Sequence, residues 1–138
     1  MSIYKKFSSD TDLESNAGIT VDYGDFKITI KRAGGSNKAF GKLFNDKIKP
    51  YRLMMQAGNM DDAAALRILA ECYAETVVIG WEGITDEKDK KIPFNRENCI
   101  KVLTDLPELF GMIQDEANRA SNFRKAETEA EAKNSVKS

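Results

Sequence analysis

Residues 60–81 read MDDAAALRILAECYAETVVIGW, and this stretch decides the fold. Its apolar residues recur every three or four positions, which is the period of an α-helix. The members of this wide apolar face are Leu66, Ile68, Leu69, Cys72, Tyr73, Val77, Ile79 and Trp81. A helix that is apolar around most of its circumference lies inside a protein. We therefore expect a central helix, with the core centred on residues 63–81 and with fraying along the β-branched run before Gly80.

Two short runs upstream of this helix predict a β-hairpin. Apolar and polar residues alternate over residues 19–23 and again over residues 26–30. Gly24 and Asp25 lie between the runs and are typical of a tight turn. Because two strands alone are marginally stable, the helices are expected to cover one face of the hairpin.

A second amphipathic helix is predicted between the hairpin and the central helix. Ser36 or Asn37 is expected to cap it, and its apolar stripe consists of Phe40, Phe44, Ile48, Tyr51 and Met55. Pro50 interrupts this stripe, so we expect the helix to be kinked or split there. Asn59 is expected to cap the central helix that follows.

Downstream of Trp81 a charged loop separates the central helix from two further predicted helices. Asn95 is expected to cap the first, and Pro107 suits the first turn of the second. Together these signals predict a mainly α fold, a compact helical domain of about four to five helices with an N-terminal β-hairpin. We expect a flexible arm over residues 1–18, a single domain over residues 19–124, and a charged, disordered or frayed tail over residues 125–138.

The net charge of −1 conceals a strong asymmetry. Residues 26–56 hold eight basic residues against Asp46 alone, a net charge of +7, so the rest of the chain carries −8. Solvated helix faces that differ in sign explain this pattern as well as a complementary partner or second copy does.

Residue types argue against catalysis and against cofactor binding. The chain has no histidine, which removes the commonest general base and the commonest zinc ligand. Residues 32–43 read RAGGSNKAFGKL and miss the spacing of a phosphate loop, so their glycines are better explained as a strand-to-helix turn. We expect no enzyme activity, no cofactor and no metal. Cys72 and Cys99 are expected to be reduced thiols without a function.

No apolar run reaches the roughly 20 residues of a membrane span, so no membrane role is expected. Nucleic acid is a weaker alternative partner for the basic region, because its aromatic residues lie on the predicted core stripe. This alternative is a small nucleic-acid-associated regulatory protein that uses residues 26–56.

The second half of the chain resembles tail assembly chaperones of long-tailed (siphovirus-type) phages and prophages. The matching positions run from Tyr73-Ala74-Glu75 through Gly80-Trp81-Glu82, Thr85-Asp86, Pro93-Phe94 and Asn98 to Leu106-Pro107, Leu109 and Phe110. Residues 32–38 and 50–52 also fit, so the resemblance covers roughly residues 26–124. The family commonly has a glycine in the acidic turn, where this chain has Asp89-Lys90-Lys91.

The resemblance implies a non-catalytic assembly factor that binds the tape measure protein, keeps it soluble and promotes polymerisation of the tail tube around it. It further implies that the protein associates with itself, and the major tail tube protein is a possible second partner. Many members of this family also exist in a longer form made by a programmed ribosomal frameshift, so the same is expected here. The expected location is the host cytoplasm, and the mature virion is expected to lack the protein.

The candidate partner-binding residues divide into a basic and an apolar set. We expect the basic residues to lie around the edge of the partner-binding surface. We expect the apolar residues to line grooves between helices and to hold the base of the loop after Trp81. They are Lys38, Lys42, Lys49, Arg52, Trp81, Phe94, Leu109 and Phe110.

Overall fold

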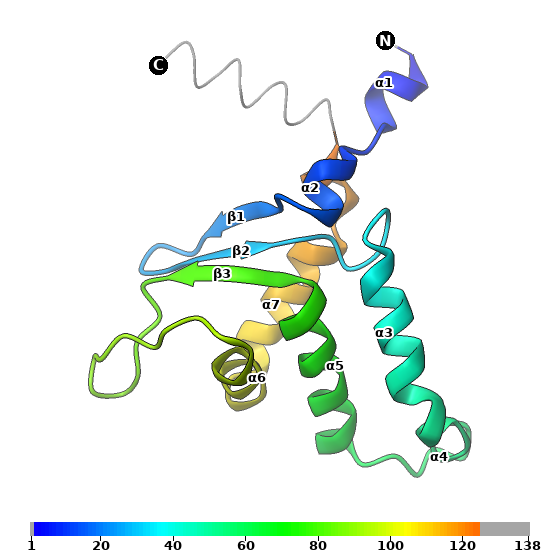
Figure 1. The fold of residues 1–138 in the computed structure, drawn as a ribbon, viewed down its shortest axis with the longest axis vertical. Coiled ribbons are helices and arrows are strands. Elements are labelled where there is room, and N and C mark those ends of the chain that lie inside the picture. The colour runs from blue at the N-terminus through cyan, green and yellow to red at the C-terminus, as the bar shows by residue number, and fades with distance from the viewer. Residues whose placement is uncertain (1, 125–138) are drawn as a thin grey trace.

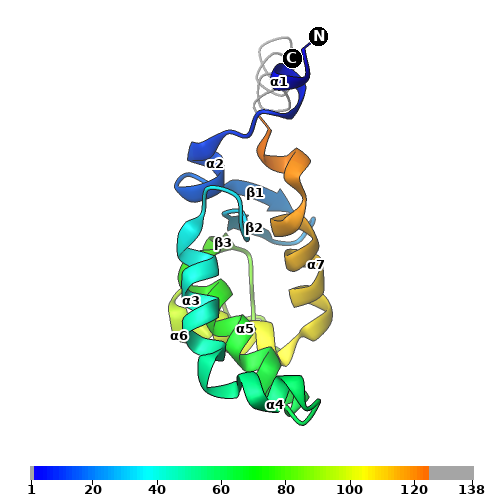
Figure 2. The same ribbon diagram turned by 90° about the vertical axis from the view of Figure 1, so that its right-hand side faces the viewer.

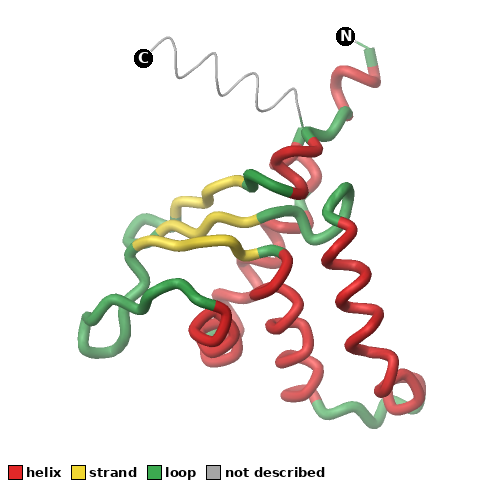
Figure 3. The backbone as a smooth tube through the Cα atoms, in the orientation of Figure 1, coloured by secondary structure: helices red, strands yellow, loops and turns green. Residues whose placement is uncertain are grey.

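A computed structural model describes residues 2–124. A small antiparallel sheet of β1, β2 and β3 lies against a group of helices, with α5 at the centre (Figures 1 and 3). The inner face of the sheet contributes Ile28 and Ile30 to the core, and both side chains are about 1% exposed. Helices α5, α6 and α7 supply most of the other core side chains, including Tyr73, Leu103 and Phe110, and Val77 and Val78 add to them.

The predicted hairpin is present. Strand β1 (Ile19–Asp22) pairs antiparallel with β2 (Lys27–Ile30), with Ile19 opposite Ile30. Gly24 adopts a φ of 98°, which only glycine tolerates readily, and its backbone N–H donates to the Asp22 carboxylate at 2.8 Å. The local turn signal was therefore sufficient to locate this element.

The end of the predicted central helix is instead a strand. Helix α5 (Asp62–Thr76) stops four residues before Gly80, and β3 (Val78–Glu82) pairs antiparallel with β2. The β-branched residues that were expected only to fray the helix form the third strand, because β2 offers them a free edge. The sheet is thus three-stranded, and Ile79 faces outward with 39% exposure.

Helix α5 is nevertheless the centre of the molecule. Ala70, Cys72 and Tyr73 are buried, and the helix packs against α3, α6 and β3. Its N-cap is Asp61 and not Asn59, and the cap makes no side-chain hydrogen bond. The prediction of the cap was wrong by two residues.

Pro50 splits the second amphipathic segment, as predicted. The pieces are α3 (Lys38–Ile48), a 3₁₀ turn η1 (Lys49–Tyr51) and α4 (Arg52–Gln56). Phe40 packs edge-on against Tyr73, with ring centroids 5.4 Å apart, so the first half of the stripe meets the core. The second half does not, because Tyr51 and Met55 are exposed beyond the break.

The last two predicted helices are confirmed with their caps. The Asn95 side chain accepts from the backbone N–H of Asn98 at the start of α6 (Arg96–Asp105). Pro107 opens α7 (Pro107–Asn118), which is followed by a 3₁₀ turn η2 (Ala120–Phe123). None of the described helices has the length and apolar character needed to cross a membrane.

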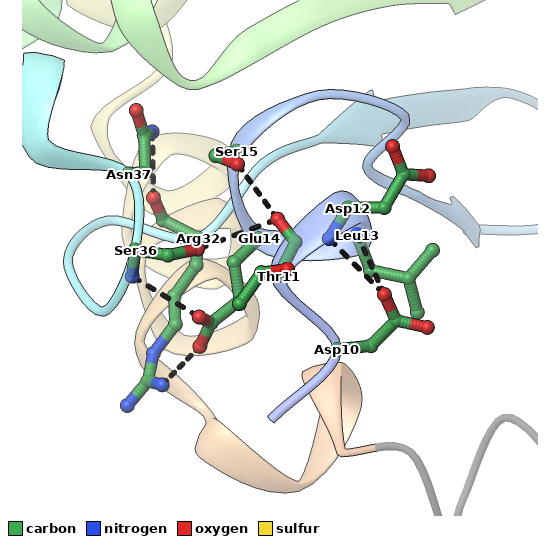
Figure 4. A network of polar contacts seen from close by, with 9 residues as sticks. All are labelled: Asp10, Thr11, Asp12, Leu13, Glu14, Ser15, Arg32, Ser36 and Asn37. Atoms are coloured by element: carbon green, nitrogen blue, oxygen red, sulfur yellow. Dashed lines mark hydrogen bonds and ion pairs between the residues drawn. The ribbon is translucent and has the colours of Figure 1, made fainter. Parts of the chain in front are cut away.

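The range predicted as a flexible arm contains two short helices, α1 (Ile3–Phe7) and α2 (Thr11–Ser15). Helix α1 buries no residue, whereas Glu14 of α2 is 2% exposed. Glu14 forms an ion pair with Arg32 and accepts the backbone N–H of Ser36 at 3.0 Å (Figure 4). The expectation of a loose arm therefore does not hold for α2. The predicted tail over 125–138 lies outside the described residues.

The fold class is mainly α, as predicted, and α3, α5, α6 and α7 are the helices of ten or more residues within the described part. They correspond to the four predicted segments. The additions are the short helices near the N-terminus and the third strand, neither of which has a strong periodic signal.

Candidate partner-binding surface

The basic candidates lie along one side of the molecule. Lys38 and Lys42 are one turn apart on α3, Lys49 belongs to η1, and Arg52 opens α4; all four are exposed. Within residues 2–124 none of them takes part in an ion pair. We call these four residues the basic stripe. Exposed positive charges that have no ion-pair partner favour the approach of an acidic partner.

Lys47 shows what pairing does on the same helix. It faces α5, where its Nζ lies 2.8 Å from the Glu71 carboxylate. This hydrogen bond is the main reason that the pKa of Glu71 is held below its ordinary value, with burial acting in the opposite direction. Lys47 therefore joins α3 to α5, whereas the basic stripe and the exposed Asp46 form no ion pair within the described residues.

An apolar groove opens where α3 and α4 meet α5. It has a volume of about 190 Å³ and is lined by Phe44, Ile48, Met55, Met60, Ala65, Ile68 and Leu69. We call it the α4 groove. Its lining contains no charged residue, and flexible methionines let such a surface adapt to different side chains.

Next to the α4 groove, the turn after Pro50 exposes further apolar surface. Leu53 is 81% exposed, Met54 and Met55 are each 44% exposed, and Tyr51 is at the margin with 36%. The sequence predicted two of these residues as core, because their spacing continues that of Phe40. The signal in the sequence for this exposure was Pro50, because a proline that breaks a helix lets the residues after it turn away from the face that the first half presents.

Trp81 and Phe94 hold the loop over residues 83–95 and lie away from the basic stripe. Their rings meet edge to face with centroids 5.0 Å apart, and the Trp81 indole N–H donates to the Ile92 carbonyl at 2.8 Å. The backbone N–H of Ile92 in turn donates to Ile84 at 2.9 Å. The loop is bracketed at its base as predicted, and residues 85–91 at its tip are exposed.

The tip of this loop is ordered by Asp86. Its carboxylate accepts the backbone N–H groups of Lys88 and Lys90, at 2.8 and 3.0 Å. Asp89 adopts a φ of 60°, a left-handed backbone conformation that glycine adopts more readily than other residues. The charged residues here make a compact turn, and the described residues contain no cluster of three or more acidic or cysteine groups arranged for a metal ion.

The candidate Phe110 lies in the core and is not exposed at the surface of the described structure. Its side chain is fully buried and packs edge-on against Tyr73, with ring centroids 5.1 Å apart. Its position on the apolar face of α7 points it into the core, so no partner reaches it in this fold. Leu109 is half-buried and also packs against the core. The structure thus keeps the four basic candidates together and separates them from the four apolar ones.

The glycine turn at residues 32–37 binds an internal carboxylate. Gly34 and Gly35 have positive φ values, and Figure 4 shows Glu14 seated between Arg32 and Ser36. A Cβ at Gly35 would lie 2.5 Å from the Glu14 carboxylate, so glycine is required there. The glycines make the strand-to-helix turn that the sequence predicted, and the turn in addition holds the Glu14 carboxylate.

Both cysteines are free and buried. Burial raises the pKa of the Cys99 thiol to about 12 and also raises that of Cys72. A thiol with so high a pKa is protonated and weakly nucleophilic at neutral pH.

Comparison with known proteins gives one result. The family model described as YdaY prophage protein matches residues 35–134, which is 100 of the 138 residues. Curated proteins and solved structures gave no match. The matched range contains the basic stripe, the α4 groove and the loop over residues 83–95. This chain belongs to the YdaY prophage protein family.

Proposed function

We propose that this prophage protein is a tail assembly chaperone that binds the tape measure protein and keeps it soluble while tail tube subunits polymerise around it. It acts without catalysis, in the host cytoplasm, and is absent from the finished particle. The major tail tube protein is a second candidate partner. A frameshift-extended form of the chain belongs to the same proposal.

The observation that carries the proposal is the α4 groove, in a part of the chain that also carries the basic stripe. A long amphipathic helix is recognised by a groove that accepts its apolar side chains at helical spacing. Charged residues around such a groove set orientation and association rate more than affinity. The groove is lined by residues of α3, α4 and α5 together with Met60, and the basic stripe lies on α3, η1 and α4.

Two further observations agree with this proposal. The family match puts the chain among prophage proteins, and the resemblance over residues 26–124 is to tail assembly chaperones. The loop over residues 83–95 contains the matching positions Thr85, Asp86, Pro93 and Phe94. Its base is packed, and its exposed tip is free to meet a partner.

The test is co-expression with a tape measure protein from the same prophage. The wild-type chain is expected to increase the soluble fraction of that protein. Reversal of Lys38, Lys42 and Lys49 to Glu should reduce this rescue while circular dichroism and the melting temperature stay unchanged. A matched control reverses Lys27, Lys101 and Arg119 to Glu, three exposed cations that lie outside the basic stripe, the α4 groove and the loop tip.

The proposal fails if the stripe variant rescues as well as the wild type and deletion of the gene leaves tail formation intact. The unpaired basic stripe also supports the second candidate, a nucleic-acid-associated regulator. A gel shift under salt titration separates the two, because phosphate binding weakens steeply with salt.

A further inference from the structure

Two apolar surfaces lie exposed at opposite ends of the described part of the molecule. One is α1, in which Ile3 is 71%, Tyr4 81% and Phe7 54% exposed. The other is the α4 groove with its exposed rim. Figures 1 and 2 place α1 and α4 at opposite ends of the long axis in both views.

Helix α1 presents its apolar residues as helical anchors. Ile3 and Phe7 are four residues apart, and Tyr4 and Phe7 are three apart, so the three side chains project from neighbouring positions on the surface of α1. Anchors at this spacing are how amphipathic helices enter grooves. The helix is capped by Ser2, whose side chain accepts the backbone N–H of Lys5.

The base of α1 is fixed to the body. Ser9 forms a bridge with Arg124, and the Asp10 backbone N–H donates to Phe123 at 2.6 Å. The Arg124 guanidinium lies over the Phe7 ring, 4.9 Å from its centroid. Because α1 is held at one end and the α4 groove lies at the other, α1 cannot reach the groove of its own chain.

The size of the α4 groove suits side chains rather than a small molecule. Ligand pockets usually have volumes of about 300–1,000 Å³, whereas this groove has about 190 Å³. A groove of that size accommodates one or two large side chains, such as those of Ile3 and Tyr4. Its lining is apolar, which matches the apolar anchors.

Charges at the two surfaces are complementary. Helix α1 carries Lys5 and Lys6 and no acidic residue. Asp61 and Asp62 follow directly after Met60 of the groove lining, and both are exposed. Neither carboxylate has an ion-pair partner in the part of the chain that the structure describes. A docked α1 would bring its lysines to these carboxylates.

We propose that α1 of one copy docks into the α4 groove of a second copy, so that the free protein associates head to tail. The contact joins two different surfaces and leaves one of each free at the ends, which extends the assembly beyond a dimer. This proposal concerns the chain alone and does not rest on its role towards the tape measure protein.

The first test measures self-association of the full-length protein by sedimentation velocity over a range of concentrations. Wild type is expected to form species larger than a dimer. An α1 variant (Ile3→Ser, Tyr4→Ser) and a groove variant (Met55→Lys, Ala65→Lys) should each dissociate at least about tenfold more readily. All four positions are exposed, so both variants are expected to fold. Met112→Lys on α7, a methionine of similar exposure, is the matched control and should associate like wild type.

Mixing the two variants gives the decisive result. The α1 variant retains its groove and the groove variant retains its α1, so together they should form a one-to-one dimer that grows no further. A symmetric interface would not be restored by mixing, and that outcome overturns the proposal. A wild type that stays monomeric, or an α1 variant that associates normally, overturns it as well.

A charge exchange tests the orientation. Asp61→Lys with Asp62→Lys should weaken association, and adding Lys5→Asp with Lys6→Asp in the same chain should restore it. Failure of the restoration, with all variants folded by circular dichroism, contradicts the proposed contact between α1 and the start of α5.

Discussion

Glu14 is a buried carboxylate whose charge is kept by its neighbours. Burial acts to raise its pKa, but the hydrogen bonds from Arg32 and Ser36 outweigh burial and hold the pKa below the ordinary value of a glutamate. Gly35 leaves the space that the carboxylate occupies. The ion pair joins α2 to the turn before α3, and it therefore attaches the N-terminal segment to the domain.

Glu14→Gln is expected to lower the free energy of unfolding by about 1–3 kcal/mol, because it leaves buried hydrogen-bonding groups poorly matched. Urea denaturation at pH 7 measures this. The control is Glu75→Gln, which removes an exposed ion pair with Arg96 and should change stability by less than about 1 kcal/mol.

The pH dependence of the same variant has a defined sign. Since the folded pKa of Glu14 is lowered, its stabilisation is present above the unfolded value of about 4.3. It is lost as the pH falls through the folded pKa. The stability difference between wild type and Glu14→Gln should therefore be constant at neutral pH and shrink below about pH 4. A difference that grows with acidity would contradict this assignment.

Tyr73 connects three helices through its ring. It is 1% exposed and packs edge-on against both Phe40 and Phe110. Tyr73→Ala is expected to cost about 3–5 kcal/mol as a core cavity. Leu69→Ala, at the half-buried wall of the α4 groove, should cost less, and thermal melts of both variants provide the measurement. Equal losses would mean that the groove is closed in solution.

Among the elements, β3 and the loop after it depend on each other. Strand β3 positions Trp81, and the indole N–H of Trp81 bonds the far side of the loop at Ile92. The strand is also the edge of the sheet that contacts α5. This arrangement explains why an apolar segment leads directly into an exposed charged loop, since the strand and the ring together hold the base of that loop.

Trp81→Phe is expected to loosen the loop while leaving the domain folded. The variant loses one hydrogen bond of about 1 kcal/mol and part of the contact with Phe94. Trypsin should then cleave after Lys88, Lys90 or Lys91 faster than in wild type. Cleavage after Lys5 and Lys6 in α1 is the internal reference and should keep its rate. Unchanged cleavage at the loop would show that Phe94 alone orders it.

On the scale of the whole molecule, the N-terminal residues serve two purposes. Helix α1 buries nothing, whereas α2 supplies Glu14 to the interior. The boundary of the folded domain therefore lies between the two helices, near the bridge from Ser9 to Arg124.

Two truncations test this boundary. Deleting residues 2–7 should change the free energy of unfolding by less than about 1 kcal/mol, because only exposed side chains are lost. Deleting residues 2–16 should lower the free energy of unfolding by several kcal/mol, because it removes Glu14 and leaves the partly buried Arg32 guanidinium without its ion-pair partner. Chemical denaturation of both truncated proteins is the measurement. A large loss from the shorter deletion would place α1 inside the domain.

The sequence by itself determined the elements whose signals are local. Gly24-Asp25 located the hairpin, Pro50 located the break after α3, and Asn95 and Pro107 located the starts of α6 and α7. Each of these signals acts within a few residues through backbone geometry or a cap hydrogen bond. The periodic apolar face of α5 likewise showed which helix is central.

Only the tertiary structure decided the features that depend on distant residues. Residues 78–82 became a strand because β2 offered a free edge, which overrode the helical period. Phe110 lies in the core because α7 turns it towards Tyr73. The α4 groove and the pairing of Glu14 with Arg32 join segments that lie far apart in the chain. Burial and pairing across such distances follow from how elements pack, and a local pattern carries no information about that packing.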